Sequence, residues 1–352
     1  MDASKFAKLT LTALRSNLGP LKNPYKLTFS ITYMCQSRCM TCNIWEIKPK
    51  GELSLEEIRQ FAQKNSHFKW VEITGGEPFL RSDIVEIARA FKENCRDLYV
   101  LTMPTNSLCN KDMELAKMEE ILKLGIPRVV VTISLDGYRE LHDKIRGIPG
   151  NFDKAIAMFK GLQELKKRHG NLDMVFGYTM SKFNQGQLEK TYEEVKKLVP
   201  EITHNTFHIN VGQLSDIYYS NTGIDMLAEK AVLAQEIEAF ISKREKKVGD
   251  VTLIESAFLK KLVKYVQTEQ VPLKSRSLDA SLFMDSYGNV YPSIMWGRKI
   301  GNIRETGFDL APLWNNAEAN EVRSLIKQGK EPKGWTACEA YQTLVGNIKS
   351  ML

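Results

Sequence analysis

The stretch Thr28-Phe-Ser-Ile-Thr-Tyr-Met-Cys35-Gln-Ser-Arg-Cys39-Met-Thr-Cys42 joins a short β-rich run to three cysteines spaced Cys-x3-Cys-x2-Cys. Three thiols on one tight loop cannot all form disulfides with each other, but they can converge on one inorganic centre. A cubane [4Fe–4S] cluster usually takes four thiolates, so three would leave one iron open to a small-molecule ligand. The spacing alone leaves two alternatives open: three unrelated thiols, or a zinc site that lacks one of its usual four ligands.

A second motif, Val71-Glu-Ile-Thr-Gly75-Gly76-Glu77-Pro78, follows about one βα unit later. In it an apolar strand runs directly into two glycines, a carboxylate and a proline. Glycines let a ligand approach the backbone closely, and a carboxylate can bind an ammonium group. The motif therefore predicts a ligand site at the end of this strand.

Together, the cysteine triad and the GGEP-type strand end resemble the signature of the radical SAM superfamily. The resemblance implies that the cysteines ligate one [4Fe–4S] cluster, whose open iron is chelated by the amino and carboxylate groups of S-adenosylmethionine (SAM). The implied cluster ligands are Cys35, Cys39 and Cys42. The implied site for the SAM amino group is formed by Gly75, Gly76 and Glu77, and Pro78 is a further implied cofactor-binding residue.

From residue 27 onwards, apolar β-rich runs alternate with helical runs. We expect strands at 27–32, 69–74, 98–103, 128–135, 172–180 and 203–210, with helices between them at about 54–65, 82–93, 111–124, 152–169 and 187–198. Six βα repeats with short connections predict a parallel α/β sheet. Right-handed crossovers would close it into a partial (β/α)6 TIM-like barrel, which is also the fold that the resemblance implies. In such barrels the chemistry lies at the carboxyl ends of the strands.

Other polar residues near strand ends are further candidates for the SAM site. By resemblance, Ser134 contacts the SAM ribose or carboxylate and Arg146 pairs with that carboxylate; the alternatives are a helix cap and a surface ion pair. Strand three ends at Thr105-Asn106, where Ser107 replaces the glycine of the family's Thr-Asn-Gly turn. The remaining candidates are Asp136, which faces either SAM or substrate, and Thr179 with Tyr178, Asn184, His208 and Asn210, which line the pocket or are satisfied polar groups at the barrel rim.

The composition of the chain limits the class of protein, the partners and the compartment that we expect. The chain has 352 residues, of which 43% are hydrophobic and 26% charged, which is typical of a globular protein with one barrel and a smaller appendage. The net charge of +7 suits an anionic substrate, a membrane surface or simple solubility. No compact Arg-rich stripe with aromatics is present, so nucleic acid is not expected as a partner. No signal peptide or spanning run is visible, and an oxygen-sensitive cluster favours a cytoplasmic protein.

We expect four segments: an N-terminal helix in 1–22, the barrel in 23–222, a helical linker in 223–270, and a small α+β extension in 271–352. The N-terminal helix is basic and amphipathic. It either packs on the barrel or makes a peripheral membrane contact near a lipid-linked substrate. The linker is expected to hold two helices broken near 248–250.

The extension contains an expected β-hairpin at 278–293 and resembles the SPASM/twitch extensions of the superfamily, whose cysteines bind auxiliary iron–sulfur clusters. Leu278, Ser293 and Gly334 stand where that pattern has cysteines, and only Cys338 remains. One thiolate cannot hold a cluster that needs about four. The resemblance therefore implies a degenerate extension without metal.

The resemblance implies an enzyme that reductively cleaves SAM to a 5′-deoxyadenosyl radical and abstracts a hydrogen from its substrate. A flavodoxin- or ferredoxin-type protein would supply the electron. Without auxiliary clusters to accept electrons, a redox-neutral or reductive transformation is favoured, with Cys338 as a candidate hydrogen donor or else a buried remnant. We expect a sugar or lipid-linked substrate, with a ribosomal peptide as the alternative. A non-catalytic iron–sulfur electron-transfer or scaffold protein is the alternative from another class.

Overall fold

The structure is a computed structural model that describes residues 2–245 and 250–347, and within them it forms a nine-stranded sheet. The spatial order of the strands is β6-β5-β4-β3-β2-β1-β7-β8-β9. Neighbours among the first six strands pair in parallel, which gives the expected partial barrel. These strands are β1 (Lys26–Thr32), β2 (Trp70–Gly75), β3 (Val100–Thr105), β4 (Arg128–Ser134), β5 (Leu172–Met180) and β6 (Phe207–Val211).

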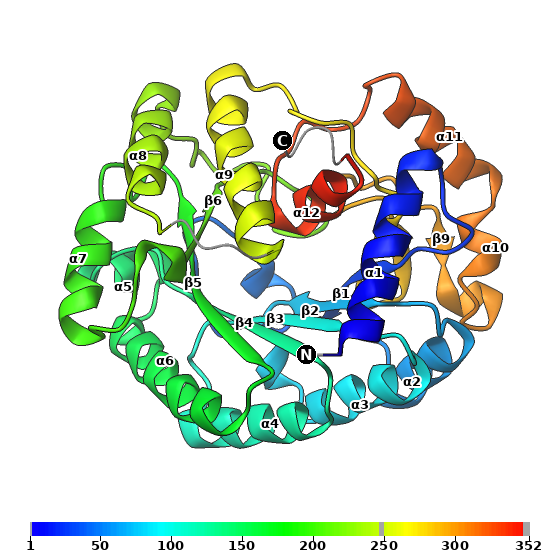
Figure 1. Cartoon of the computed structure of the whole chain (residues 1–352), viewed down its shortest axis with the longest axis horizontal. Helices are drawn as coiled ribbons and strands as arrows, with labels where there is room; N and C mark the ends of the chain where they lie inside the picture. Colours follow the sequence, from blue (N-terminus) through cyan, green and yellow to red (C-terminus); the bar gives the residue numbers. More distant parts are fainter. Residues whose placement is uncertain (1, 246–249, 348–352) are drawn as a thin grey trace.

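Helices follow the strands and cover the convex face of the sheet (Figure 1). The covering helices are α2 (Leu55–Lys64), α3 (Ile84–Asn94), α4 (Lys111–Lys123), α6 (Asn151–Arg168) and α7 (Leu188–Leu198). They match the five helices expected from the sequence. A short helix, α5 (Glu140–Arg146), was not expected, because only seven residues form it and its pattern is not periodic. The linker holds the two expected helices, α8 (Lys230–Ser242) and α9 (Asp250–Thr268).

Apolar and polar side chains alternate along β1, so the two faces of the strand lie in different environments. Leu27, Phe29 and Ile31 are fully buried in the core under the helices. Lys26, Thr28, Ser30 and Thr32 alternate with them and are also buried. Since successive side chains of a strand point to opposite faces, the concave interior of the barrel is lined by polar groups from β1.

The C-terminal extension continues the barrel sheet. β7 (Ser281–Met284) pairs in parallel with β1, and β8 (Asn289–Tyr291) and β9 (Gly301–Asn302) follow as antiparallel strands. The hairpin expected at 278–293 is therefore confirmed, with the turn glycine Gly288 at φ +81°. The helices α10 (Ala311–Trp314) and α11 (Ala317–Lys327) come next, and α12 (Ala337–Val345) is the last described helix.

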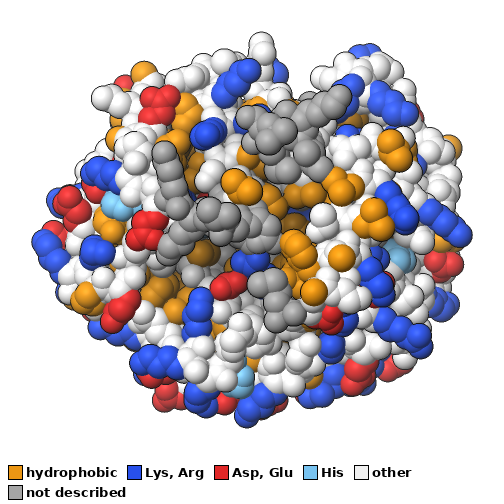
Figure 2. Space-filling model, viewed as in Figure 1, with side chains coloured by type: hydrophobic (Ala, Val, Ile, Leu, Met, Phe, Trp, Pro, Cys, Tyr) orange, Lys and Arg blue, Asp and Glu red, His pale blue; other side chains and the backbone are white. Residues whose placement is uncertain are grey.

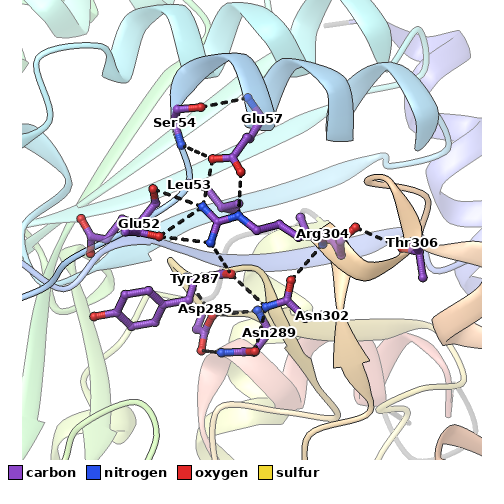
Figure 3. A network of polar contacts seen from close by, with 12 residues as sticks. Glu52, Leu53, Ser54, Glu57, Asp285, Tyr287, Asn289, Asn302, Arg304 and Thr306 are labelled. Carbon is purple, nitrogen blue, oxygen red and sulfur yellow. Dashed lines mark hydrogen bonds and ion pairs between the residues drawn. The ribbon is translucent and has the colours of Figure 1, made fainter.

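An arginine network connects this extension to the segment that follows the cysteine loop (Figure 3). Arg304 donates from Nε and Nη2 to the two carboxylate oxygens of Glu57, at 2.6 and 3.0 Å, and from Nη1 to the Gly51 carbonyl. The neighbouring Glu52 carboxylate accepts from the Thr32 hydroxyl and the Tyr33 main-chain N–H. The end of β1 is thus fixed by residues that also contact the extension.

The N-terminal helix α1 (Ala3–Arg15) packs on the barrel, in agreement with the first of the two expected alternatives. Its Phe6 ring lies 5.5 Å from the Tyr99 ring, and Lys8 pairs with Asp97 at 2.7 Å. Both partners precede β3, so α1 covers the amino end of that strand. On the face seen in Figure 2, Lys and Arg side chains are interspersed with Asp and Glu. None of the described helices combines the length and the apolar character needed to cross a membrane.

Candidate active site

The cysteine loop follows β1 at the carboxyl edge of the parallel strands. Cys35, Cys39 and Cys42 are free thiols, each partly buried. Main-chain hydrogen bonds hold the loop from outside: Arg38 and Met40 donate to carbonyls at the end of α5, and Asn43 donates to Tyr219 at 2.9 Å. The loop therefore has a defined conformation that keeps its three sulfurs on one short turn.

Three glycines make room for this loop. A Cβ on Gly75 would lie 2.1 Å from the Thr32 carbonyl oxygen, one on Gly76 would lie 2.1 Å from that of Met34, and one on Gly147 would lie 2.4 Å from that of Arg38. The sequence suggested that Gly75 and Gly76 admit a ligand. The contacts that exclude a side chain come instead from the protein's own backbone at the start of the cysteine loop.

Glu77 is a buried acceptor next to the loop. Its Oε2 accepts from the Asn106 main-chain N–H at 2.7 Å and its Oε1 from that of Phe79 at 3.2 Å. Burial, and after it the neighbouring carboxyl of Glu114, raise the pKa of Glu77 to about 8. A cationic ligand group such as an ammonium would favour the ionised carboxylate and so offset the cost of burying its charge.

The structure brings Asp136 and Arg146 together above the loop. Arg146 Nε lies 2.6 Å from Asp136 Oδ2, and Arg146 Nη1 lies 3.7 Å from Cys39 Sγ. Asp136 Oδ1 accepts from the Thr179 main-chain N–H at 2.9 Å. The sequence left Arg146 as a SAM contact or a surface ion pair. The structure shows an ion pair between the partly buried Arg146 and the buried Asp136, and Arg146 Nη1 faces Cys39.

Comparison with known proteins gives the family of this region. Residues 29–195 match the Radical SAM superfamily model. An AdoMet-dependent heme synthase of Methanosarcina barkeri is 26% identical over 330 residues, 88% of this chain and 87% of its own. A pre-heme d1 synthase of Dinoroseobacter shibae is 22% identical over 343 residues, 90% of this chain and 80% of its own. This chain carries a radical SAM domain.

The fold is similar to that of a solved structure that contains S-adenosylmethionine. SuiB of Streptococcus suis bound to S-adenosylmethionine superposes with a TM-score of 0.62 at 18% identity, covering 91% of this chain and 72% of SuiB. Residues 29–195 are therefore a radical SAM domain, the domain of an enzyme family whose cofactors are a [4Fe–4S] cluster and SAM. These similarities favour the enzyme over the alternative of a non-catalytic iron–sulfur protein.

The residues of the radical SAM domain fit these cofactors. The three thiols are free and lie on one short loop, two of them face N–H groups, and the buried carboxylate Glu77 offers a site for a cation. Within 2–245 and 250–347, no three Cys, His, Asp or Glu side chains converge on a position for a single metal ion. A cubane cluster places its thiolates on different irons, so that result concerns mononuclear sites.

The other strand-end candidates divide into two groups. Thr105 is buried at the end of β3, where its hydroxyl accepts from the Ser107 N–H at 2.9 Å, and Ser134 is half-buried at the end of β4. His208 and Asn210 on β6 do not join them. His208 Nδ1 contacts Tyr341 and Glu255, and Asn210 accepts from the Ala337 N–H, so both are satisfied by α9 and α12. For these two residues the alternative of satisfied polar groups is confirmed.

Cys338 lies at the start of α12, within the barrel interior. Its thiol donates to Glu72 Oε1 at 3.0 Å, and burial, followed by the Glu72 charge, raises the pKa of the thiol. Glu72 Oε2 in turn pairs with Lys26 Nζ at 3.1 Å. Cys338 is therefore held as a neutral thiol by a buried ion pair.

Two contributors to the site had no signal in the sequence. Asn221, in the irregular segment after β6, donates to the Thr41 carbonyl at 2.9 Å and so fixes the cysteine loop. Glu114 is buried on the first turn of α4, where a carboxylate is ordinarily explained by the helix dipole. Neither position could be connected to the loop before the chain was folded.

Proposed function

We propose that this protein uses the cluster and SAM to remove a hydrogen atom from a sugar or lipid-linked substrate, in a redox-neutral or reductive transformation. The cluster would be held by Cys35, Cys39 and Cys42. SAM would be held by Gly75, Gly76, Glu77, Pro78, Thr105, Asn106, Ser134, Asp136, Arg146 and Thr179. Bound together, the two cofactors supply a 5′-deoxyadenosyl radical after one-electron reduction, for which we propose a flavodoxin- or ferredoxin-type donor.

The observation that carries the site assignment is the convergence of two strand ends on one loop. Asn106 from β3 and Arg146 from the segment after β4 both place a side-chain nitrogen within 3.8 Å of a cysteine sulfur. Glu77 suits the ammonium group of an amino acid, and the Arg146 guanidinium supplies N–H donors that suit its carboxylate. These residues bind and orient SAM against the loop, and their burial excludes water from the reacting groups.

The redox-neutral outcome rests on the extension. Leu278 is fully buried in the core, and Ser293 and Gly334 line a small cavity of about 30 Å³. Cys338 is the only cysteine after position 109, too few thiolates for an auxiliary cluster. Its neutral S–H group, held by Glu72, could return a hydrogen atom to a substrate radical.

A second candidate substrate is favoured by the comparisons. Two relatives that match about nine-tenths of this chain are named as a heme synthase and a pre-heme d1 synthase. Those names support a tetrapyrrole as the alternative substrate for this chain. A ribosomal peptide remains an alternative that rests on the SPASM-type resemblance.

The test begins with anaerobically purified, reconstituted protein. We expect about four irons per chain, and 5′-deoxyadenosine formed from SAM under dithionite. Alanine at Cys35, Cys39 and Cys42 should remove the iron, whereas Cys338→Ala should retain it. Protein without iron, or with about eight irons, contradicts the assignment.

The substrate class is tested by the rate of 5′-deoxyadenosine formation. A nucleotide sugar, a polyprenyl-linked sugar, a porphyrin and a short peptide are added separately. The true class should accelerate the reaction several-fold. Acceleration by the porphyrin alone would replace the sugar or lipid-linked proposal with the tetrapyrrole alternative.

A further inference from the structure

Two of the three sulfurs of the cysteine loop face N–H donors that come from different strand ends. Asn106 Nδ2, after β3, lies 3.8 Å from Cys35 Sγ. Arg146 Nη1, at the end of α5, lies 3.7 Å from Cys39 Sγ. The third sulfur differs, because Cys42 Sγ faces the carbonyl oxygen of Tyr219 at 3.4 Å, which is an acceptor.

The Asn106 side chain has a fixed orientation. Its Oδ1 accepts from the Leu108 main-chain N–H at 3.0 Å, so the amide nitrogen must point the other way, toward Cys35. The Asn106 main-chain N–H donates to Glu77 at 2.7 Å. Both ends of the residue are thus restrained, and the N–H group that faces the sulfur cannot rotate away without breaking a hydrogen bond.

Arg146 is restrained in a similar way. Its guanidinium forms an ion pair with Asp136, in which Nε lies 2.6 Å from Oδ2, and the other oxygen of Asp136 accepts from the Thr179 N–H at 2.9 Å. Since the guanidinium group is planar and rigid, fixing Nε also fixes the direction of Nη1. The carboxylate of Asp136 therefore decides where the N–H group near Cys39 lies.

A buried bridge of two side chains connects these two donors. His142 Nδ1 accepts from the Asp136 main-chain N–H at 3.0 Å, and His142 Nε2 contacts Asn151 Oδ1 at 3.2 Å. Asn151 Nδ2 then donates to the Asn106 carbonyl at 2.8 Å. His142 and Asn151 are both fully buried.

Only one arrangement of protons satisfies this chain of contacts. Because Asp136 donates to Nδ1, the imidazole proton must be on Nε2, which then donates to the Asn151 oxygen and leaves the Asn151 nitrogen for Asn106. Burial, and after it the charge of Arg146, lower the pKa of His142 to about 3, so the ring stays neutral. The bridge thereby fixes the position of Asn106, after β3, relative to that of Asp136, after β4.

We propose that Asn106 and Arg146 donate N–H···S hydrogen bonds that raise the reduction potential of the cluster, and that His142 and Asn151 are positioning residues that align the two donors. The proposal rests on the proposed function, because the sulfurs must be the cluster ligands. Hydrogen bonds to ligand sulfurs stabilise the reduced, more negative state and thus raise the potential. Groups behind the ligands commonly tune metal centres in this way.

The test is an EPR-monitored redox titration of the reconstituted holoenzyme without SAM. The variants are Asn151→Leu and His142→Phe, each measured with its iron content and melting temperature. Asn65→Leu is a matched control, because Asn65 is also a buried amide that donates to main-chain carbonyls, but of Phe61 and Phe308, away from the loop. We expect four irons in all three, a more negative midpoint in the first two, and an unchanged midpoint in the control.

A conservative variant distinguishes an effect on the alignment of the two N–H donors from a general loss of protein stability. His142→Gln keeps one acceptor and one donor, so its midpoint should return toward that of the unmodified enzyme. If His142→Phe does not fold, Asn106→Ser removes one N–H···S donor directly and should also lower the midpoint. An unchanged midpoint in folded Asn151→Leu with four irons overturns the proposal, as does an equal shift in Asn65→Leu. Absence of iron in the unmodified protein would instead refute the proposed function.

Discussion

Ser107 adopts a backbone conformation that is unfavourable for a residue with a side chain. It has a φ of +61°, in the left-handed region that favours glycine, and its hydroxyl is buried without a hydrogen-bond partner. The family's turn has glycine in this place. The serine therefore carries both backbone strain and an unsatisfied polar group.

We predict that Ser107→Gly stabilises the protein by about 1 kcal/mol, since relief of strain and of the buried hydroxyl exceeds the extra chain entropy of glycine. Urea unfolding with an unchanged denaturant slope would measure it. A loss of stability would mean that the hydroxyl has a role that this conformation does not reveal.

His67 predicts a pH dependence of stability. Its ring lies 4.6 Å from the Phe68 ring, and its Nε2 is buried without a partner. Burial, and after it the charge of Lys69, lower the pKa of His67 to about 4, below the value near 6.5 of the unfolded chain. The unfolded state thus binds more protons between these values, so this contribution is complete above pH 6.5 and declines as the pH falls toward 4.

The comparison of unmodified protein with His67→Phe isolates this contribution. Between pH 7.5 and 5.5 the unmodified protein should lose about 1 kcal/mol more unfolding free energy than the variant, after allowance for partial exposure of the ring. Phenylalanine keeps the ring contact with Phe68 but cannot be protonated. Equal losses in both proteins would show that His67 is not held neutral.

At the scale of elements, the site depends on how closely the cysteine loop approaches the ends of β2 and α5. Gly147 ends α5 with a φ of +70°, and an added Cβ would lie 2.4 Å from the Arg38 carbonyl oxygen. Gly150 has a similar φ of +76° but no atom within 4 Å of an added Cβ. The pair therefore separates backbone strain from steric exclusion of the loop.

We predict that Gly150→Ala loses about 1 kcal/mol of stability, because it places a Cβ in the left-handed region, and that Gly147→Ala loses more, because its Cβ also clashes with the Arg38 carbonyl. Only Gly147→Ala should also lose most of its iron, since its methyl group displaces the backbone between Cys35 and Cys39. Iron per chain and melting temperature after anaerobic purification give the comparison. Full iron content in folded Gly147→Ala would show that the loop can move without losing its ligands.

At the scale of the whole molecule, a buried lysine joins the barrel to its last helix. Lys26 Nζ pairs with Glu72, donates to Gln342 Oε1 at 3.1 Å, and also donates to the Cys338 carbonyl. β1, β2 and α12 therefore meet at one charge. Removing one member of a buried ion pair usually costs more than removing both, because an unpaired charge is left behind.

We predict that Lys26→Met lowers the unfolding free energy by about 3 kcal/mol, and that adding Glu72→Gln recovers at least about 1 kcal/mol. Glutamine keeps one oxygen, which can accept from either Thr28 or Cys338. A double-mutant cycle by urea unfolding measures the coupling. If the two losses simply add, the pair is not what fixes α12 to the barrel.

The sequence determined what is local or periodic. Six strands and five covering helices followed from the alternation of apolar runs, because side-chain spacing dictates which face an element buries. The hairpin turn at Gly288 and the cysteine spacing are likewise short-range patterns. The radical SAM character was also readable, since the motifs that carry it lie within single loops.

Only the tertiary structure decided which residues meet across the sheet. The parallel pairing of β7 with β1, the meeting of His142 with Asn151, and the contact of Cys338 with Glu72 join positions that no local pattern relates. The glycines next to Glu77 were attributed to ligand access, yet it is the neighbouring backbone that excludes a side chain there. Such contacts depend on the closure of the barrel, because carboxyl ends of parallel strands come together only when the sheet is complete.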